Sequence, residues 1–234
     1  MSIWTRISAA VAGLLARGEE LIALFERRDA RPERSVAFTI AVISLGAKMA
    51  KVDGRVNASE VAAFRRVFQI APEDEAAAAR VFNLARQDIA GFDIYAARIA
   101  RMFRRRPRVL EDILEGLFYI AVSDGGYHDA EEGFLRRVAE IFGIAPAAFD
   151  CIEARHVVGD GRDPWRVLGV SRDADAATVR ARWRTLVREN HPDRLIARGL
   201  PAESIALANA RLAAINAAWE EISAREAPLK QQAG

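Results

Sequence analysis

Apolar residues recur along this chain at the three- and four-residue spacing of amphipathic helices, and no stretch alternates with the two-residue period of a strand. Prolines and glycine-containing turns separate the helical segments. In the first two thirds of the chain we expect helices over Val36–Lys51, Ala58–Phe68, Pro72 to about Ile89, Ile94–Phe103, Val109–Ser123, Asp129–Phe142 and Pro146–Arg155. The last third predicts two more, over Thr178–Arg188 and from Ile205 to Ile222. The predicted fold class is therefore all-α.

Residues 1–35 form a separate amphipathic segment at the N-terminus. Its apolar residues recur at helical spacing and are Ile3, Trp4, Ile7, Val11, Leu14, Leu15, Leu21, Ile22 and Phe25. Four arginines follow, namely Arg27, Arg28, Arg31 and Arg34. The apolar runs are shorter than the roughly 20 residues that a membrane span needs. Two interpretations remain open: a helix that packs on its own domain, or a helix that lies on the membrane surface or is a degenerate anchor.

An internal repeat follows at an offset of 71 residues. Asp53–Glu60 aligns with Asp124–Glu131, and both copies place an Asp-Gly turn between an apolar helix and an amphipathic helix. Two such units predict a helical domain with pseudo-twofold symmetry over residues 36–154. The repeated pattern resembles the tellurite-resistance TerB family over about residues 36–150. That resemblance implies that the acidic residues of the two copies come together, with Asp53, Glu60, Asp124 and Glu131 as candidate ligands of a divalent cation.

Helix capping offers a second explanation for the same acids. Asn57 with Glu60 fits a capping box, and Asp129 with Glu132 fits the same role in the second copy. The aspartates of both turns can bond their own backbone. Glu131 is then the acid that capping leaves unexplained.

The last third carries three blocks in a fixed order. Asp163–Val170 comes first, His191-Pro192-Asp193 second, and Leu212–Glu220 third. Together they resemble the J domain of DnaJ-type co-chaperones, over residues 163–226. Residues 155–162 are the predicted linker, because two glycines and mixed charges lie there, and residues 227–234 are a tail.

The apolar pattern of this region predicts an antiparallel pair of helices. The first helix places Val179, Trp183, Leu186 and Val187 on one face. The second carries Ile205, Ala208, Leu212, Ile215, Trp219 and Ile222 at alternating spacings of three and four. Proline disfavours helix at the residue before it. We therefore expect His191-Pro192-Asp193 in an exposed connecting loop.

The first helix of the pair also carries charge of one sign. Its charged residues before Glu189 are the arginines Arg180, Arg182, Arg184 and Arg188. Like charges four residues apart repel and do not stabilise a helix. One interpretation is an ordinary solvated face. The other is a basic docking face that steers the chain onto an acidic partner.

Composition narrows the remaining function classes. The chain has 34 Lys+Arg, 32 Asp+Glu, three histidines and one cysteine. Residues 1–159 are electrically neutral, and the net +2 lies in residues 160–234. The run Arg104–Arg106 with Arg108 suggests a nucleic-acid binder, but the neutral first part argues against a nucleic-acid footprint. No catalytic motif is found, so we interpret Cys151 and His156 as structural and His128 as a surface turn residue.

The whole pattern resembles DjlA-type co-chaperones, which join a TerB-like domain to a C-terminal J domain. That resemblance implies a DnaK-type chaperone as partner, whose ATP hydrolysis is stimulated by His191, Pro192 and Asp193. It implies an activator and not an enzyme, with no required cofactor, in the cytoplasm or at the cytoplasmic face of the inner membrane. Such proteins usually carry an N-terminal span, and we find no convincing one. The alternative is a metal- or stress-sensing TerB-like module that uses the J domain as an adaptor.

Overall fold

The structure is a computed structural model. In the residues that it describes, all regular secondary structure is helical. These are residues 3–16, 23, 34–52, 70, 72–87, 91–124, 127–157, 163–198, 200–201 and 205–231. The all-α prediction is confirmed for these ranges. The predicted helix over 58–68 and the first copy of the internal repeat from residue 53 lie outside them.

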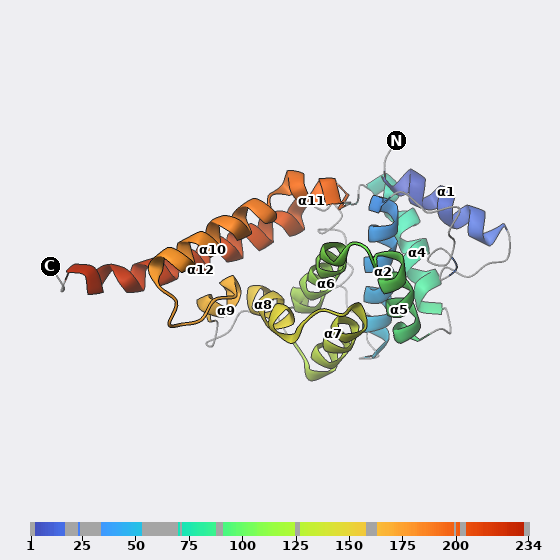
Figure 1. Ribbon diagram of the computed structural model, residues 1–234. Helices are drawn as coiled ribbons and strands as arrows, with labels where there is room; N and C mark the ends of the chain where they lie inside the picture. Colours follow the sequence, from blue (N-terminus) through green and yellow to red (C-terminus); the bar gives the residue numbers. More distant parts are fainter. Residues whose placement is uncertain are drawn as a thin grey trace.

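The helices form two lobes (Figure 1). The N-terminal lobe contains α1 (Ile3–Leu15), α2 (Arg34–Val52), η2 (Pro72–Asp74), α4 (Glu75–Gln87), α5 (Phe92–Met102), α6 (Pro107–Ala121), η3 (Val122–Asp124), α7 (Asp129–Phe142) and α8 (Pro146–His156). The C-terminal lobe contains α9 (Pro164–Leu168), α10 (Ala176–Glu189), α11 (Pro192–Arg198) and α12 (Ile205–Gln231). Most predicted bounds agree with these to within a few residues.

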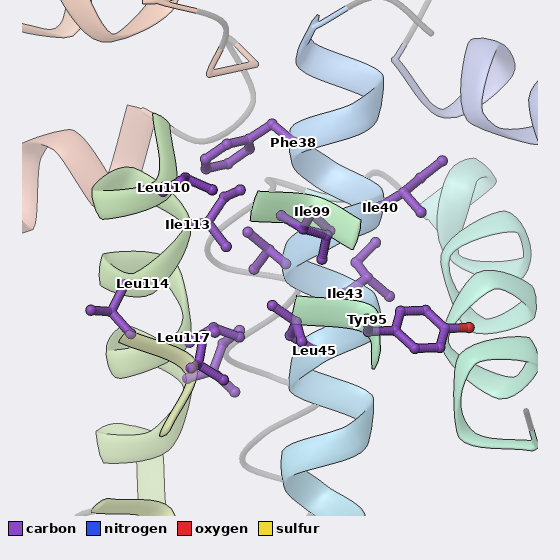
Figure 2. Close-up of a cluster of buried hydrophobic side chains, with 14 of the residues drawn as sticks. Phe38, Ile40, Ile43, Leu45, Tyr95, Ile99, Leu110, Ile113, Leu114 and Leu117 are labelled. Carbon is purple, nitrogen blue, oxygen red and sulfur yellow. The ribbon is translucent and has the colours of Figure 1, made fainter. Parts of the chain in front are cut away.

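Helix α2 is the centre of the N-terminal lobe. All of its residues from Val36 to Met49 are buried, as expected for a helix that is apolar on every side. It packs against α1, α4, α5, α6 and α7. Figure 2 shows its side chains beside those of α5 and α6, and the labelled residues are Phe38, Ile40, Ile43, Leu45, Tyr95, Ile99, Leu110, Ile113, Leu114 and Leu117.

Helix α1 packs on its own lobe. Its apolar face is buried against α2 and α4 and consists of Ile3, Trp4, Ile7, Val11 and Leu14. This arrangement favours the docking-helix interpretation over the membrane-surface interpretation, because the face that would enter a bilayer is already covered. Leu21, Ile22 and Phe25 lie outside the described residues.

In the C-terminal lobe, α10 and α12 lie side by side and extend away from the N-terminal lobe (Figure 1). Their shared core, closed by α9, contains Val167, Leu168, Val179, Leu186, Ile215, Ala218 and Ile222. Trp183 and Trp219 stack with their ring centroids 5.1 Å apart. Trp183 Nε1 also donates a hydrogen bond to Asn216 Oδ1 at 3.0 Å.

The end of this hairpin near α11 belongs to a different core than predicted. Leu195, Leu200, Leu207 and Ala208 are buried in the apolar cluster of the N-terminal lobe. Ala208, predicted in the seam of the helix pair, therefore lies in the core of the N-terminal lobe. The buried core of the hairpin begins further along α12, at Ile215. Gly116 of α6 lies at this contact, where a Cβ would be at ordinary contact distance, 3.4 Å from Val42 and 3.8 Å from Leu207.

The boundary between the lobes also differs from the prediction. The predicted linker begins at Arg155, whereas α8 continues through His156. Both side chains are largely buried against Glu115. The sequence does not reveal this, because the last turn of a basic helix end looks like the start of a charged linker.

Candidate interaction site at the His-Pro-Asp motif

The His-Pro-Asp motif lies where two helices meet. Helix α10 ends at Glu189, and Asn190 caps it: the Asn190 backbone N–H and the side-chain Nδ2 both donate to Leu186 O, at 2.9 and 2.8 Å. Pro192 then begins α11, a position where proline costs no hydrogen bond. The prediction of a connecting loop is therefore corrected, because Pro192 and Asp193 form the first turn of α11.

His191 and Asp193 are presented to solvent. The two side chains are 57% and 86% exposed. Nδ1 of His191 accepts a hydrogen bond from the Asp193 backbone N–H at 3.3 Å. In the neutral imidazole this places the proton on Nε2, which then remains available as a donor to a partner.

Three of the four predicted docking arginines share the exposed surface of α10. Arg180, Arg184 and Arg188 are exposed, and the structure shows no ion pair for them within its described residues. Arg182 is instead partly buried and faces α9, where its Nε donates to Leu168 O at 3.0 Å. It lines a cleft of about 90 Å³ between the lobes. The predicted docking face therefore consists of Arg180, Arg184 and Arg188.

The predicted acidic cluster is mostly outside the described residues. Asp53 and Glu60 lie outside them, and only the backbone of Asp124 is described. Glu131 Oε2 accepts a hydrogen bond from the backbone N–H of His128, the N-cap of α7, at 3.1 Å. The predicted Asp129–Glu132 capping box is therefore wrong by one residue, and Glu131 is the capping acid.

A metal site remains a prediction. In the part of the chain whose placement is known, no group of three or more His, Cys, Asp or Glu side chains could hold a metal ion.

An interlobe ionic cluster is the main feature that the sequence analysis missed. Its members are Asp112 and Glu115 of α6, Arg155 and His156 of α8, Arg198 of α11 and Arg211 of α12. Arg211 Nη1 donates to Asp112 Oδ1 at 2.8 Å, and Arg198 Nη2 donates to the same oxygen at 3.1 Å. His156 Nε2 lies 2.6 Å from Glu115 Oε2, and Arg155 pairs with Glu115 Oε1.

The cluster keeps the carboxyl of Glu115 ionised. Burial by itself would raise the pKa of the Glu115 carboxyl, but Arg211, Arg155 and His156 outweigh that effect. They hold the pKa well below its ordinary value of 4.5. The guanidinium of Arg211 also loses solvation on burial, yet Glu115 and Asp112 raise its pKa. The two charges are therefore present together inside the molecule, as a buried pair requires.

A signal for this cluster exists in the sequence. Asp112 and Glu115 stand three residues apart in a segment whose other residues from Val109 to Ala121 are almost all apolar. A helix that is apolar on every side is buried, so its acids must meet buried partners. Charge spacing alone does not say which arginines of the remaining chain supply them.

Comparison with known proteins defines the class of the N-terminal lobe first. The family description of tellurite resistance protein TerB matches residues 39–154. These residues are a TerB domain, which includes α6 and nearly all of α8 and therefore carries Asp112 and Glu115.

The homologues of this chain are proteins named co-chaperone protein DjlA. The one from Shewanella oneidensis is 30% identical over 129 residues, which is 50% of this chain and 49% of the relative. The one from Escherichia coli (strain K12) is 32% identical over 144 residues, or 52% and 51%. The one from Photobacterium profundum is 26% identical over 216 residues, or 81% and 78%. In the first two matches this chain spans about half the length of the relative.

Two further comparisons are brief. No solved structure matches the chain. Among the described helices, none combines the length and the apolar character needed to cross a bilayer.

Proposed function

We propose that this chain is a co-chaperone that docks on a DnaK-type chaperone and stimulates its ATP hydrolysis through His191, Pro192 and Asp193. The C-terminal lobe is the J domain in this proposal. The TerB domain is the targeting or sensing module. The chain activates a partner ATPase and does not itself hydrolyse ATP.

The observation that carries the proposal is the exposed motif beside an exposed basic face. His191 and Asp193 are 57% and 86% exposed at the start of α11. Arg180, Arg184 and Arg188 are exposed on the adjoining helix α10. A small rigid group with a donor and a carboxylate, next to three exposed cations, suits recognition of an acidic protein surface.

The two parts of this surface have different tasks in the proposal. The arginines attract and orient an acidic face of the chaperone, which acts mainly on the rate of association. The motif then makes short-range contacts, with Nε2–H of His191 as donor and the Asp193 carboxylate as acceptor. Homology to proteins named co-chaperone protein DjlA supports the co-chaperone role itself.

A single-turnover ATPase assay tests the proposal. ATP hydrolysis by a DnaK-type chaperone is measured with and without the chain, and again with His191→Gln. We expect stimulation by the wild type and its loss in the variant, since the exposed side chain contributes little to folding. His128→Gln is the matched control, because His128 is also exposed but lies in the TerB domain. A His191→Gln variant that stimulates fully would refute the assignment of the motif.

A further inference from the structure

One buried nitrogen joins the TerB domain to the residue that precedes the His-Pro-Asp motif. Arg211 Nη1 donates to Asp112 Oδ1 at 2.8 Å and to Asn190 Oδ1 at 2.9 Å. Asn190 in turn caps α10 and is followed directly by His191. The N-terminal side of the motif is therefore two hydrogen bonds away from a carboxylate of α6.

The same carboxylate oxygen holds the other end of the segment. Arg198, the last residue of α11, donates from Nη2 to Asp112 Oδ1 at 3.1 Å. The stretch from Asn190 to Arg198 contains the whole motif and the whole of α11. Asp112 thus anchors both ends of the segment that presents His191 and Asp193.

Burial makes this anchor strong. The side chains of Asp112 and Arg211 are 1% and 3% exposed. Charge-assisted hydrogen bonds out of contact with water are short and directional. Beneath the segment, Leu195 and Leu200 pack into the apolar core of the TerB domain. The segment therefore rests on the TerB domain from below and is tied to it at both ends.

We propose that Asp112 of the TerB domain is a positioning residue for the His-Pro-Asp motif, and that it acts through Arg211 and Asn190. The TerB domain then sets how efficiently the motif stimulates a chaperone. The expected effect on ATPase stimulation rests on the proposed function. The expected effect on hydrogen exchange around the motif is independent of that function.

The test uses the full chain with Asp112→Asn, which keeps the shape of the side chain and removes its charge. Hydrogen exchange is followed by mass spectrometry in two peptides, one over residues 189–198 and one over residues 176–186. We expect exchange in the first peptide to accelerate severalfold and exchange in the second to stay unchanged. Since a displacement of about 1 Å far from the chemistry can cost roughly 100-fold in rate, maximal ATPase stimulation should fall about tenfold or more.

A double variant separates positioning from stability. Replacing a buried ion pair by apolar residues of similar size is often neutral for stability. Asp112→Leu with Arg211→Met should therefore unfold in urea near the wild-type midpoint, while residues 189–198 still exchange fast and stimulation stays low. Arg166→Gln is the control for the interlobe contact itself. Arg166 of α9 pairs with Asp150 and Glu153 of α8 at 3.8 and 3.6 Å and does not touch Asn190.

The outcomes are distinct. If residues 189–198 of Asp112→Asn exchange at the wild-type rate, Asp112 does not anchor the segment and the proposal is overturned. If exchange accelerates equally in both peptides, the variant has lost stability in general, and the proposal is overturned as well. Full stimulation by a variant with a loosened segment would overturn its functional part. If the wild type stimulates no chaperone, the proposed function fails, and the exchange data still decide whether Asp112 positions the motif.

Discussion

Cys151 of α8 lies against Gly169 of α9 so closely that no side chain fits between them. A Cβ on Gly169 would be 2.9 Å from Cys151 Sγ. Gly169 also has a φ of +67°, in the left-handed region that favours glycine, and caps α9. One glycine therefore ends a helix and allows the two lobes to approach each other.

Gly169→Ala is expected to destabilise the protein through both effects. The left-handed conformation alone costs about 1–2 kcal/mol for a residue with a Cβ, and overpacking adds about 1–3 kcal/mol. Gly143→Ala is the matched control, because Gly143 has a φ of +70° and nothing within 4 Å of its Cβ position. Urea unfolding should show the larger loss for Gly169→Ala.

Cys151→Ala should cancel the difference between these two variants. Without Sγ, Gly169→Ala retains only its backbone cost and should resemble Gly143→Ala in a double-mutant cycle. If Gly169→Ala costs the same with and without Cys151, the close contact between α8 and α9 is wrong.

A substitution at Ile7 of α1 tests whether this helix is part of the N-terminal lobe. Its side chain is completely buried, so Ile7→Ala should lower the free energy of unfolding by about 2–5 kcal/mol. Leu15→Ala on the same helix removes a side chain that is 50% exposed and should cost much less. Equal, small losses together with co-sedimentation on anionic phospholipid vesicles would instead support the membrane-surface interpretation.

The pH dependence of stability should reveal Glu115. Its charge partners are Arg155 and His156 of α8 and Arg211 of α12, and Asp112 lies one turn away on α6. Because folding lowers the pKa of this carboxyl, its contribution is fully present above the unfolded pKa of about 4.5 and is lost as the pH falls below it. Glu115→Gln removes the negative charge that Arg155, His156 and Arg211 face, and should cost about 3 kcal/mol at pH 7.

The measurement is urea unfolding of the wild type and Glu115→Gln at pH 7, 5 and 4. The difference between them should hold from pH 7 to 5 and shrink progressively below about pH 4.5, because the unfolded wild type then takes up a proton that the folded carboxyl does not. A point at pH 3 is added where the wild type remains folded, and a difference as large there as at pH 7 would contradict the buried pair. A difference near zero at pH 7 would contradict it.

Most helices of this fold follow from the sequence. The prediction for Asp129–Phe142 matches α7 residue for residue, because an acidic first turn and a C-terminal glycine mark its ends. The hairpin core around Val179, Leu186, Ile215 and Ile222 also follows from helical spacing. Local signals suffice where a helix has one apolar face and clear caps.

The contact between the lobes does not follow from local signals. Arg155, His156 and Arg211 resemble solvated charges in the sequence, and their partners Asp112 and Glu115 lie 40 to 99 residues away. Arg182 is the exception, because it stands two residues from Arg180 and Arg184, and helical spacing already places it off the face that those arginines share. It meets α9 instead. Which charges are buried is decided by how the lobes dock, and that arrangement depends on the whole fold.

The divalent-cation hypothesis for Asp53, Glu60, Asp124 and Glu131 can be tested directly. Titration calorimetry with calcium, magnesium and zinc is compared for the wild type and Asp124→Asn. If the acids form a site, at least one ion should give a saturating heat that the variant loses. Glu131→Gln is a poor choice of variant, since Glu131 also caps α7. The absence of heat with all three ions would dispose of the hypothesis.

Charge reversal on α10 gives the sharpest test of electrostatic docking. Arg184→Glu removes an exposed cation from the proposed docking face and adds an anion to it. At low salt, binding to a DnaK-type chaperone should weaken roughly tenfold or more, mainly through slower association. Near 1 M salt, where the Debye length is about 3 Å, the variant and the wild type should converge. Arg80→Glu makes the same change of net charge at an exposed arginine of α4, in the N-terminal lobe. It should leave association nearly unaffected.

The test is the association rate measured at 50, 150 and 500 mM salt. If the rates of Arg184→Glu and the wild type depend on salt in the same way, the arginines of α10 are not part of the docking surface.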